Sequence, residues 1–340
     1  MSYARREEPD AFAPLAAALA SDLHIAIAQF SREPERKVVS RAEVLLSPKF
    51  TTAQSFKVIA LCCLQHWALN RDAVIAGDPE GVHQMRVGLR RMRAALSIFK
   101  GMTDDRETKR LKGELKWLTE QLAGARDTSV FLDDTLKPHR HTYVRGLTAL
   151  EGHVEDLRKE GLEKARTAVE SARFRELVLR TFLWVLAGPW THREAANAAQ
   201  SPRSFARHAL TKRTKKIVKK TAKVEKLDEV RRHKLRIAIK KLRYASDFFD
   251  ELFPGRKSAR KRFAKILKEL QDDLGELNDI RTHRDYSEKL LQPREAHAAT
   301  LNEAFALGYV AGEEHSDIPA LLAATRKSGR RLSSARPFWN

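Results

Sequence analysis

The stretch His83-Gln84-Met85-Arg86-Val87-Gly88-Leu89-Arg90-Arg91-Met92-Arg93 returns 150 residues later as His233-Lys234-Leu235-Arg236-Ile237-Ala238-Ile239-Lys240-Lys241-Leu242-Arg243. In both copies a histidine comes first and an arginine follows three residues after it. A basic pair stands seven and eight residues after the histidine, and an arginine stands ten residues after it. Phe99 and Phe249 keep the same offset. The chain therefore carries an internal duplication.

Each copy has the spacing of an amphipathic helix. With 3.6 residues per turn, the histidine and the three arginines of the first copy fall on one stripe, which holds His83, Arg86, Arg90 and Arg93. An apolar stripe lies beside it and holds Met85, Leu89, Met92, Leu96 and Phe99. We therefore expect two helices that each bury one face and leave a cationic face for a long or multivalent anion.

The composition favours an all-α fold. The chain has 340 residues, of which 42% are hydrophobic, so it can bury an ample core. Only 15 glycines and 12 prolines are present, and alternating runs of Val, Ile and Thr are nearly missing from the sequence. These features predict helices and no sheet.

The positive charge is concentrated where the motif is. The formal net charge is +20, and residues 203–243 alone hold 17 Lys or Arg against three acids. Residues 83–100 hold five basic residues and no acid. Clustered positive charge of this kind is typical of a polyanion-binding protein.

The duplication extends beyond the motif helix. Helices are expected at about 51–75, 79–101, 105–123, from 128, 140–168 and 171–187, then at 202–224, 229–253 and 258–274. The stretch 275–279 matches 123–127 at an offset of 152. We divide the chain into a weakly structured lead (1–48), a first helical bundle (49–190), a second bundle (201–325) and a loose basic tail (326–340). The simplest arrangement is two four-helix bundles related by a pseudo-twofold axis.

The helix that precedes the second motif adds its own basic stripe, made of His208, Lys212, Lys215 or Lys216, Lys219 and Lys223. The matching helix of the first half has only Lys57 and Arg71. We therefore expect two cationic walls of unequal strength.

Four features of the sequence closely resemble the CHAD family, the conserved histidine α-helical domain. They are the repeated motif, the second copy's ending Arg243-Tyr244-Ala245, the lead-in Asp78-Pro79-Glu80-Gly81-Val82 and the stretch Leu274-Gly275-Glu276-Leu277-Asn278-Asp279. The resemblance covers about residues 50–330. It implies two four-helix bundles around a basic surface that binds inorganic polyphosphate, and a place at polyphosphate granules. The implied binding residues are His83, Arg86, Arg90, Arg93, His233, Arg236, Lys240 and Arg243, to which the stripe adds Lys212, Lys216 and Lys219. Further candidates are Lys57, Arg91, Lys116, Lys223, Lys241 and Lys268; helical spacing turns Arg91 and Lys241 away from the histidine stripe.

CHAD domains often follow a CYTH domain, a triphosphate-processing β-barrel. Residues 33–37 read Glu-Pro-Glu-Arg-Lys and satisfy that family's Glu-x-Glu-x-Lys motif literally. Pro34 between the two acids and the short stretch before the helices argue against a barrel. Residues 40–43 resemble the end of a CYTH domain, so the chain is interpreted either as a descendant of such a two-domain protein or as a piece cut from one.

Other chemistry is sparse in the sequence. Cys62 and Cys63 are adjacent and cannot form an ordinary structural disulfide. His139 and His141 have no neighbouring residues that could complete a metal site. We therefore expect no metal, no cofactor and no enzymatic activity. The alternatives to polyphosphate binding are nonspecific nucleic-acid binding and a regulatory partnership with a polyphosphate-metabolising enzyme. No segment is long enough to span a membrane, and a cytoplasmic location is expected.

Overall fold

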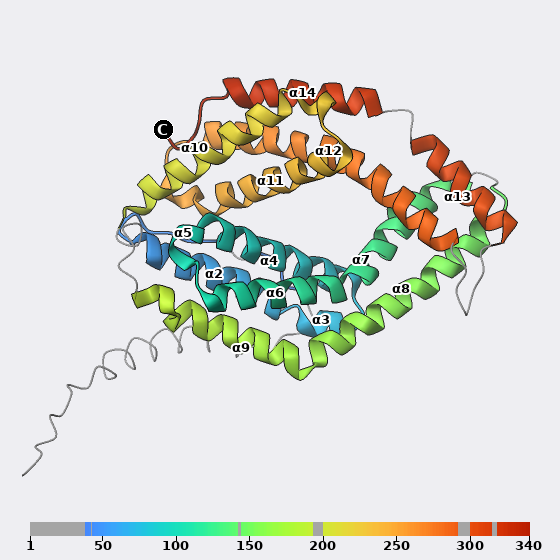
Figure 1. Ribbon diagram of the computed structural model, residues 1–340, viewed down its shortest axis with the longest axis horizontal. Helices are drawn as coiled ribbons and strands as arrows, with labels where there is room; N and C mark the ends of the chain where they lie inside the picture. The colour runs from blue at the N-terminus through green and yellow to red at the C-terminus, as the bar shows by residue number, and fades with distance from the viewer. Residues whose placement is uncertain (1–37, 42, 142–143, 193–199, 292–299, 315–317) are drawn as a thin grey trace, which may run out of the picture.

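The computed structural model describes residues 38–41, 43–141, 144–192, 200–291, 300–314 and 318–340 (Figure 1). Within these ranges the chain is helical and has no strand, which confirms the all-α prediction. The lead up to residue 37 lies outside the described residues.

The first half holds eight α-helices within the described residues: α2 (Thr52–Ala68), α3 (Arg71–Ile75), α4 (Pro79–Ile98), α5 (Lys100–Thr103), α6 (Arg106–Gln121), α7 (Ala123–Val130), α8 (Leu147–Glu170) and α9 (Ala172–Ala187). Side chains that accept hydrogen bonds from backbone N–H groups fix several helix starts. Thr51 forms a capping box with Gln54 before α2, and Asp78 caps α4, which has Pro79 at its first position. The fourth expected helix begins at Ala123, several residues earlier than predicted, and continues into a π-helical turn, Phe131–Leu136.

The second half is built from α10 (Pro202–Thr221), α11 (Glu229–Phe248), α12 (Lys257–Leu291), α13 (Leu301–Glu314) and α14 (Ile318–Ser334). Asp228 caps α11 as Asp78 caps α4. The helix predicted to end at residue 274 instead runs through Gly275 to Leu291, so that prediction was wrong. A single glycine without a following break is tolerated inside a long helix.

The helices form two layers that lie one above the other in Figure 1. The layer of the first half contains α2, α4, α6 and α9, and the layer of the second half contains α10, α11, α12 and α14. At one end, α8 and α13 close the molecule around a smaller apolar core. The motif helices α4 and α11 pack against each other, and the main core contains residues of both halves.

Aromatic side chains join the two layers. The ring centroid of Phe99 lies 6.1 Å from that of Phe249, its counterpart in the second copy. Phe99 also stacks on Phe205 of α10 at 4.7 Å. The duplicated phenylalanines therefore meet each other in the core, and this contact helps to fix how α4 faces α11.

The C-terminal tail is not loose, so this part of the prediction was wrong. Residues 326–334 belong to α14, and Phe338 and Trp339 are buried in the main core. Trp339 Nε1 donates to Thr211 Oγ1 at 2.9 Å, and Arg207 Nε donates to the Trp339 carbonyl oxygen at 2.9 Å. The lead is also partly ordered, since Val44 and Leu46 are buried. Both ends of the described chain thus add to the core.

Candidate anion-binding surface

The polar faces of α4 and α11 are set by what each helix buries. Met85, Leu89 and Met92 are almost fully buried on α4, and the matching Leu235, Ile239 and Leu242 are buried on α11. The basic side chains of each motif then lie on the remaining faces, because successive residues are offset by a fixed rotation. Most of the duplicated stripe is half-buried between the layers rather than displayed on the outside.

Two arginines form matching ion pairs in the two halves. Arg86 Nη2 lies 3.8 Å from Asp127 Oδ1, and Arg236 Nη2 lies 3.7 Å from Asp279 Oδ1. Burial lowers the pKa of both arginines, and the neighbouring aspartate acts in the opposite direction in each case. The duplicated arginines therefore form equivalent ion pairs, and in each half one aspartate pairs with the basic stripe of that half.

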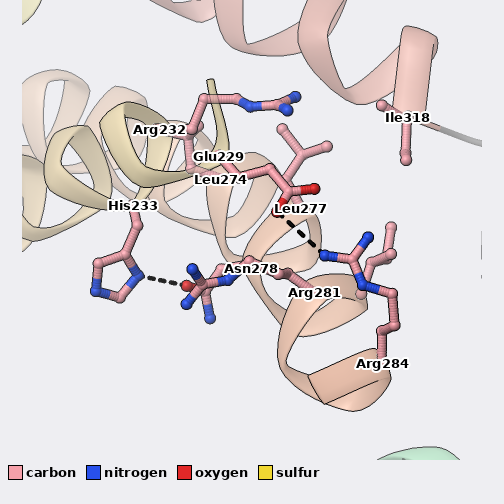
Figure 2. Close-up of a pocket in the computed structure, with 10 residues that line it drawn as sticks. Glu229, Arg232, His233, Leu274, Leu277, Asn278, Arg281, Arg284 and Ile318 are labelled. Atoms are coloured by element: carbon pink, nitrogen blue, oxygen red, sulfur yellow. Dashed lines mark hydrogen bonds and ion pairs between the residues drawn. The ribbon is translucent and has the colours of Figure 1, made fainter. Parts of the chain in front are cut away.

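The two histidines differ in their partners. Asn278 donates its amide N–H to Thr282 Oγ1 (3.2 Å) and Asp279 Oδ1 (3.3 Å), which leaves its Oδ1 to accept from His233 Nδ1 at 2.6 Å (Figure 2). The counterpart of Asn278 in the first half is Arg126. Burial lowers the pKa of His83, and the charge of Arg126 lowers it further. His233 is held by its hydrogen bond to Asn278, whereas the positive charge of Arg126 disfavours the protonated form of His83.

A small pocket next to His233 contains three arginines, Arg232, Arg281 and Arg284 (Figure 2). Glu229 also lines this pocket and accepts from Arg284 Nη2 at 3.2 Å. The positive charge of the pocket is therefore partly neutralised from within.

Cations of both halves meet around Lys240; we call Arg90, Arg236, Lys240 and Arg243 the Lys240 group. Burial, together with the charges of Arg236, Arg90 and Arg243, lowers the pKa of Lys240 to about 7, against the opposite effect of Asp279. The Nε atoms of Arg90, Arg236 and Arg243 are buried without a hydrogen-bond partner in the described chain. Such a site favours an incoming anion, because an anion would supply both the missing acceptors and the missing negative charge.

A second concentration of positive charge surrounds Lys241; we call Arg93, Lys112, Arg213, Lys216 and Lys241 the Lys241 cluster. Burial lowers the pKa of Lys241, and the charges of the other four residues lower it further. Arg213 Nη2 also donates to the Ser97 carbonyl oxygen of α4 at 3.1 Å, which ties α10 to α4.

Sequence reasoning missed Lys112 and Arg213. It named Lys241 as a candidate but ranked it below the histidine stripe, because it considered only the rotation of Lys241 on its own helix. The available signals were the place of Lys112 one turn before Lys116, and the place of Arg213 next to Lys212. Which helix faces Lys112 and Arg213 depends on the tertiary structure.

Other predicted residues lie apart from these two groups. Arg91, a further candidate of the sequence analysis, is buried, with its guanidinium 5.4 Å from the centre of the Phe248 ring, and it lies apart from both groups. Lys116 is exposed and paired with Glu120 at 3.5 Å. The remaining candidates are not linked to either group by any described contact: Lys57 is half-buried on α2, and Lys212, Lys219, Lys223 and Lys268 are exposed.

Few other sites for chemistry are found in the described ranges. Burial raises the pKa of the Cys63 thiol to about 12 and also raises that of Cys62, so neither thiol is an activated nucleophile. Among the described residues no three His, Cys, Asp or Glu side chains are grouped as metal ligands would be. No helix in the described ranges is both long and apolar enough to cross a lipid bilayer.

Comparisons with known proteins give a consistent family and fold. The family model described as "CHAD domain" matches residues 59–287. The crystal structure of the CHAD domain from the plant Ricinus communis is similar with a TM-score of 0.74 at 28% sequence identity, covering 88% of this chain and 98% of that one. PptA from Streptomyces chartreusis shares the fold, with a TM-score of 0.60 at 18% identity over 82% and 99% of the two chains. No curated protein sequence matches the chain.

Proposed function

The chain belongs to the CHAD domain family, and we propose that its basic surface binds inorganic polyphosphate without changing it chemically. The observation that carries this proposal is the Lys240 group. The charges of three arginines from both halves act on Lys240 there, and the buried Nε atoms of these arginines lack hydrogen-bond partners in the described chain. Confining like charges in a half-buried place is costly, and an anionic ligand relieves that cost.

The shape of the surface supports an extended ligand. His233 and Arg243 stand ten residues apart on α11, which corresponds to about 15 Å along a helix. A row of arginines and lysines of that length suits a chain of phosphates better than a single small anion, since guanidinium groups bind phosphate oxygens in pairs and ammonium groups follow as mobile charges.

A titration of the purified chain with polyphosphates of graded length tests the proposal. Affinity should rise with chain length and fall steeply as salt is raised, because each neutralised phosphate releases a counterion. Binding that is equal for pyrophosphate and long chains, or that shows no salt dependence, would contradict it.

Nucleic-acid binding is the main competing function. Proteins that bind single strands usually stack bases on exposed aromatic rings. The aromatics nearest to the motif, Phe99, Tyr244 and Phe249, are buried. Competition between long polyphosphate and RNA at physiological salt separates the two functions, and preferential displacement by RNA would favour the competing one.

Two further parts of the proposal concern activity and place. We propose that the chain is not an enzyme and that it associates with polyphosphate granules, either directly or as a regulatory partner of a polyphosphate-metabolising enzyme. Phosphate release from polyphosphate in the presence of Mg²⁺ or Mn²⁺ would contradict the first part. A fluorescent fusion that stays diffuse in granule-containing cells would contradict the second.

A further inference from the structure

We propose that the Lys241 cluster is a separate anion subsite, which binds short polyphosphates such as tripolyphosphate by itself and holds the most tightly bound segment of a long chain. This inference rests on the proposed function, since it states where on the surface polyphosphate is held. It places the strongest contact with polyphosphate near the end of the motif helices that is farther from the duplicated histidines.

Charge balance distinguishes the two ends of the surface. At the Arg236 end, the stripe pairs with Asp279, and the adjoining pocket is lined by further acids, namely Asp134, Asp272 and Glu276. None of the five residues of the Lys241 cluster takes part in an ion pair within the described chain, and the four charges that act most on Lys241 are all positive. An anion arriving at the surface therefore meets positive charge that acids partly neutralise at one end, and positive charge without a paired acid at the other.

The members of the cluster come from helices that pack together. Arg93 lies on α4, Lys112 on α6, Arg213 and Lys216 on α10, and Lys241 on α11; α4 packs against α6 and α11, and α10 packs against α11. The bond from Arg213 to the Ser97 carbonyl ties α10 to α4, while Arg93 and Lys216 are exposed and free to move onto a ligand. Cations contributed by several packed helices suit a compact ligand with many phosphate oxygens, whereas a row on one helix suits an extended one.

Two other basic regions lack this combination. The pocket beside His233 holds three arginines, but Glu229 already binds one of them (Figure 2). The exposed lysines Lys212 and Lys219 both lie on α10, and the groove that Lys219 lines with the C-terminal segment holds one further cation, Lys215, from the same helix. The convergence of several helices without an acid thus favours the Lys241 cluster over both.

The test compares Lys112→Gln/Lys216→Gln with the charge-matched control Lys164→Gln/Lys327→Gln. All four lysines lie on helix surfaces; Lys164 faces a groove beside α6 and α8, and Lys327 is exposed on α14. Isothermal titration with tripolyphosphate and with long-chain polyphosphate is run on both variants and on the wild type. Circular dichroism checks that each variant is folded.

The first variant should lose at least about tenfold in tripolyphosphate affinity, the effect of one lost charge-assisted contact or more. Its binding of long chains should weaken, and the slope of log affinity against log salt should become shallower by about 1.4, as expected for two lost phosphate contacts. The control should match the wild type. Arg86→Gln/Arg236→Gln should lose less tripolyphosphate affinity than Lys112→Gln/Lys216→Gln.

The inference fails if long chains bind the wild type but tripolyphosphate does not, or if the cluster variant and the control lose equal affinity. If neither ligand binds the wild type, the proposed function itself fails. The two failures are therefore distinguishable.

Discussion

Arg91 and Lys241 occupy the same position of the duplicated motif, 150 residues apart, yet they have opposite environments. Arg91 is 3% exposed and lies over the Phe248 ring. Lys241 is half-buried among four other cations. One basic residue has become part of the core and the other has become the centre of a charged cluster.

The neighbouring helix explains the difference. The helices α2 and α10 start at the same offset of 150 residues, so Cys63 and His66 of α2 correspond to Arg213 and Lys216 of α10. Arg91 faces the first pair and Lys241 faces the second. Burial raises the pKa of Cys63 to about 12 and lowers that of His66 to about 4, so both are neutral beside Arg91. The motif specifies a basic residue, and the partner helix decides whether that residue is available to a ligand.

The largest expected effect is on stability at Arg91. Arg91→Glu should lower the free energy of unfolding by about 3–5 kcal/mol, since it places an unpaired carboxylate in the core. Arg91→Met should be tolerated, because Nε and Nη1 of Arg91 already lack hydrogen-bond partners and the stem packs on apolar residues. Urea unfolding measures both, and a stable Arg91→Glu protein would remove the contrast with Lys241.

The matching change at Lys241 should affect binding instead. Lys241→Glu should reduce polyphosphate affinity by about 100-fold, since it removes one attractive charge and adds a repulsive one in the cluster. Its stability should stay equal to the wild type or rise slightly, because repulsion among the five cations is relieved. Titration calorimetry and urea unfolding of one preparation report both quantities, and a loss of stability without a loss of affinity would contradict this expectation.

A smaller effect is expected from pH at Lys240, the neighbour of Lys241. In the free protein the pKa of Lys240 is about 7, so the side chain loses its proton as pH rises through 7. A bound polyanion favours the charged form, so binding takes up a proton, and affinity should fall by up to about tenfold per pH unit above 7 and change little below it.

Titrations in buffers of different ionisation enthalpy detect that proton directly. Lys240→Arg, which stays charged throughout, should abolish both the proton uptake and this part of the pH dependence. Uptake that persists in Lys240→Arg would assign the proton to another group.

The smallest effect concerns the two histidines. Arg126→Asn gives His83 the kind of neighbour that His233 has, and the pKa of His83 should rise toward its usual value because a nearby positive charge is removed. Polyphosphate affinity should change by no more than about threefold, as is usual for a partly exposed charge. NMR titration of the His83 ring measures the pKa, and Arg126→Lys, which retains the charge, is the control.

Sequence reasoning was most successful where local rules apply. The helix starts at Thr52, Pro79 and Glu229 follow from capping residues that stand next to them. It was wrong at the C-terminal tail, where the basic composition concealed two aromatics, Phe338 and Trp339, that are buried against α10 and α12. It was also wrong at Gly275, where a local signal for a break was outweighed by the packing of one continuous helix, α12, against α11 and α14.

The sequence by itself determined that the chain is helical, duplicated and basic along two matching stripes, because side-chain direction on a helix follows from residue spacing alone. Only the tertiary structure decided which basic residues meet. Arg91 is buried in the core, Lys112 and Arg213 act on Lys241, and Arg90 acts on Lys240 of the other half. These outcomes depend on the rotation and separation of helices far apart in the chain, and electrostatic interaction changes steeply with that separation.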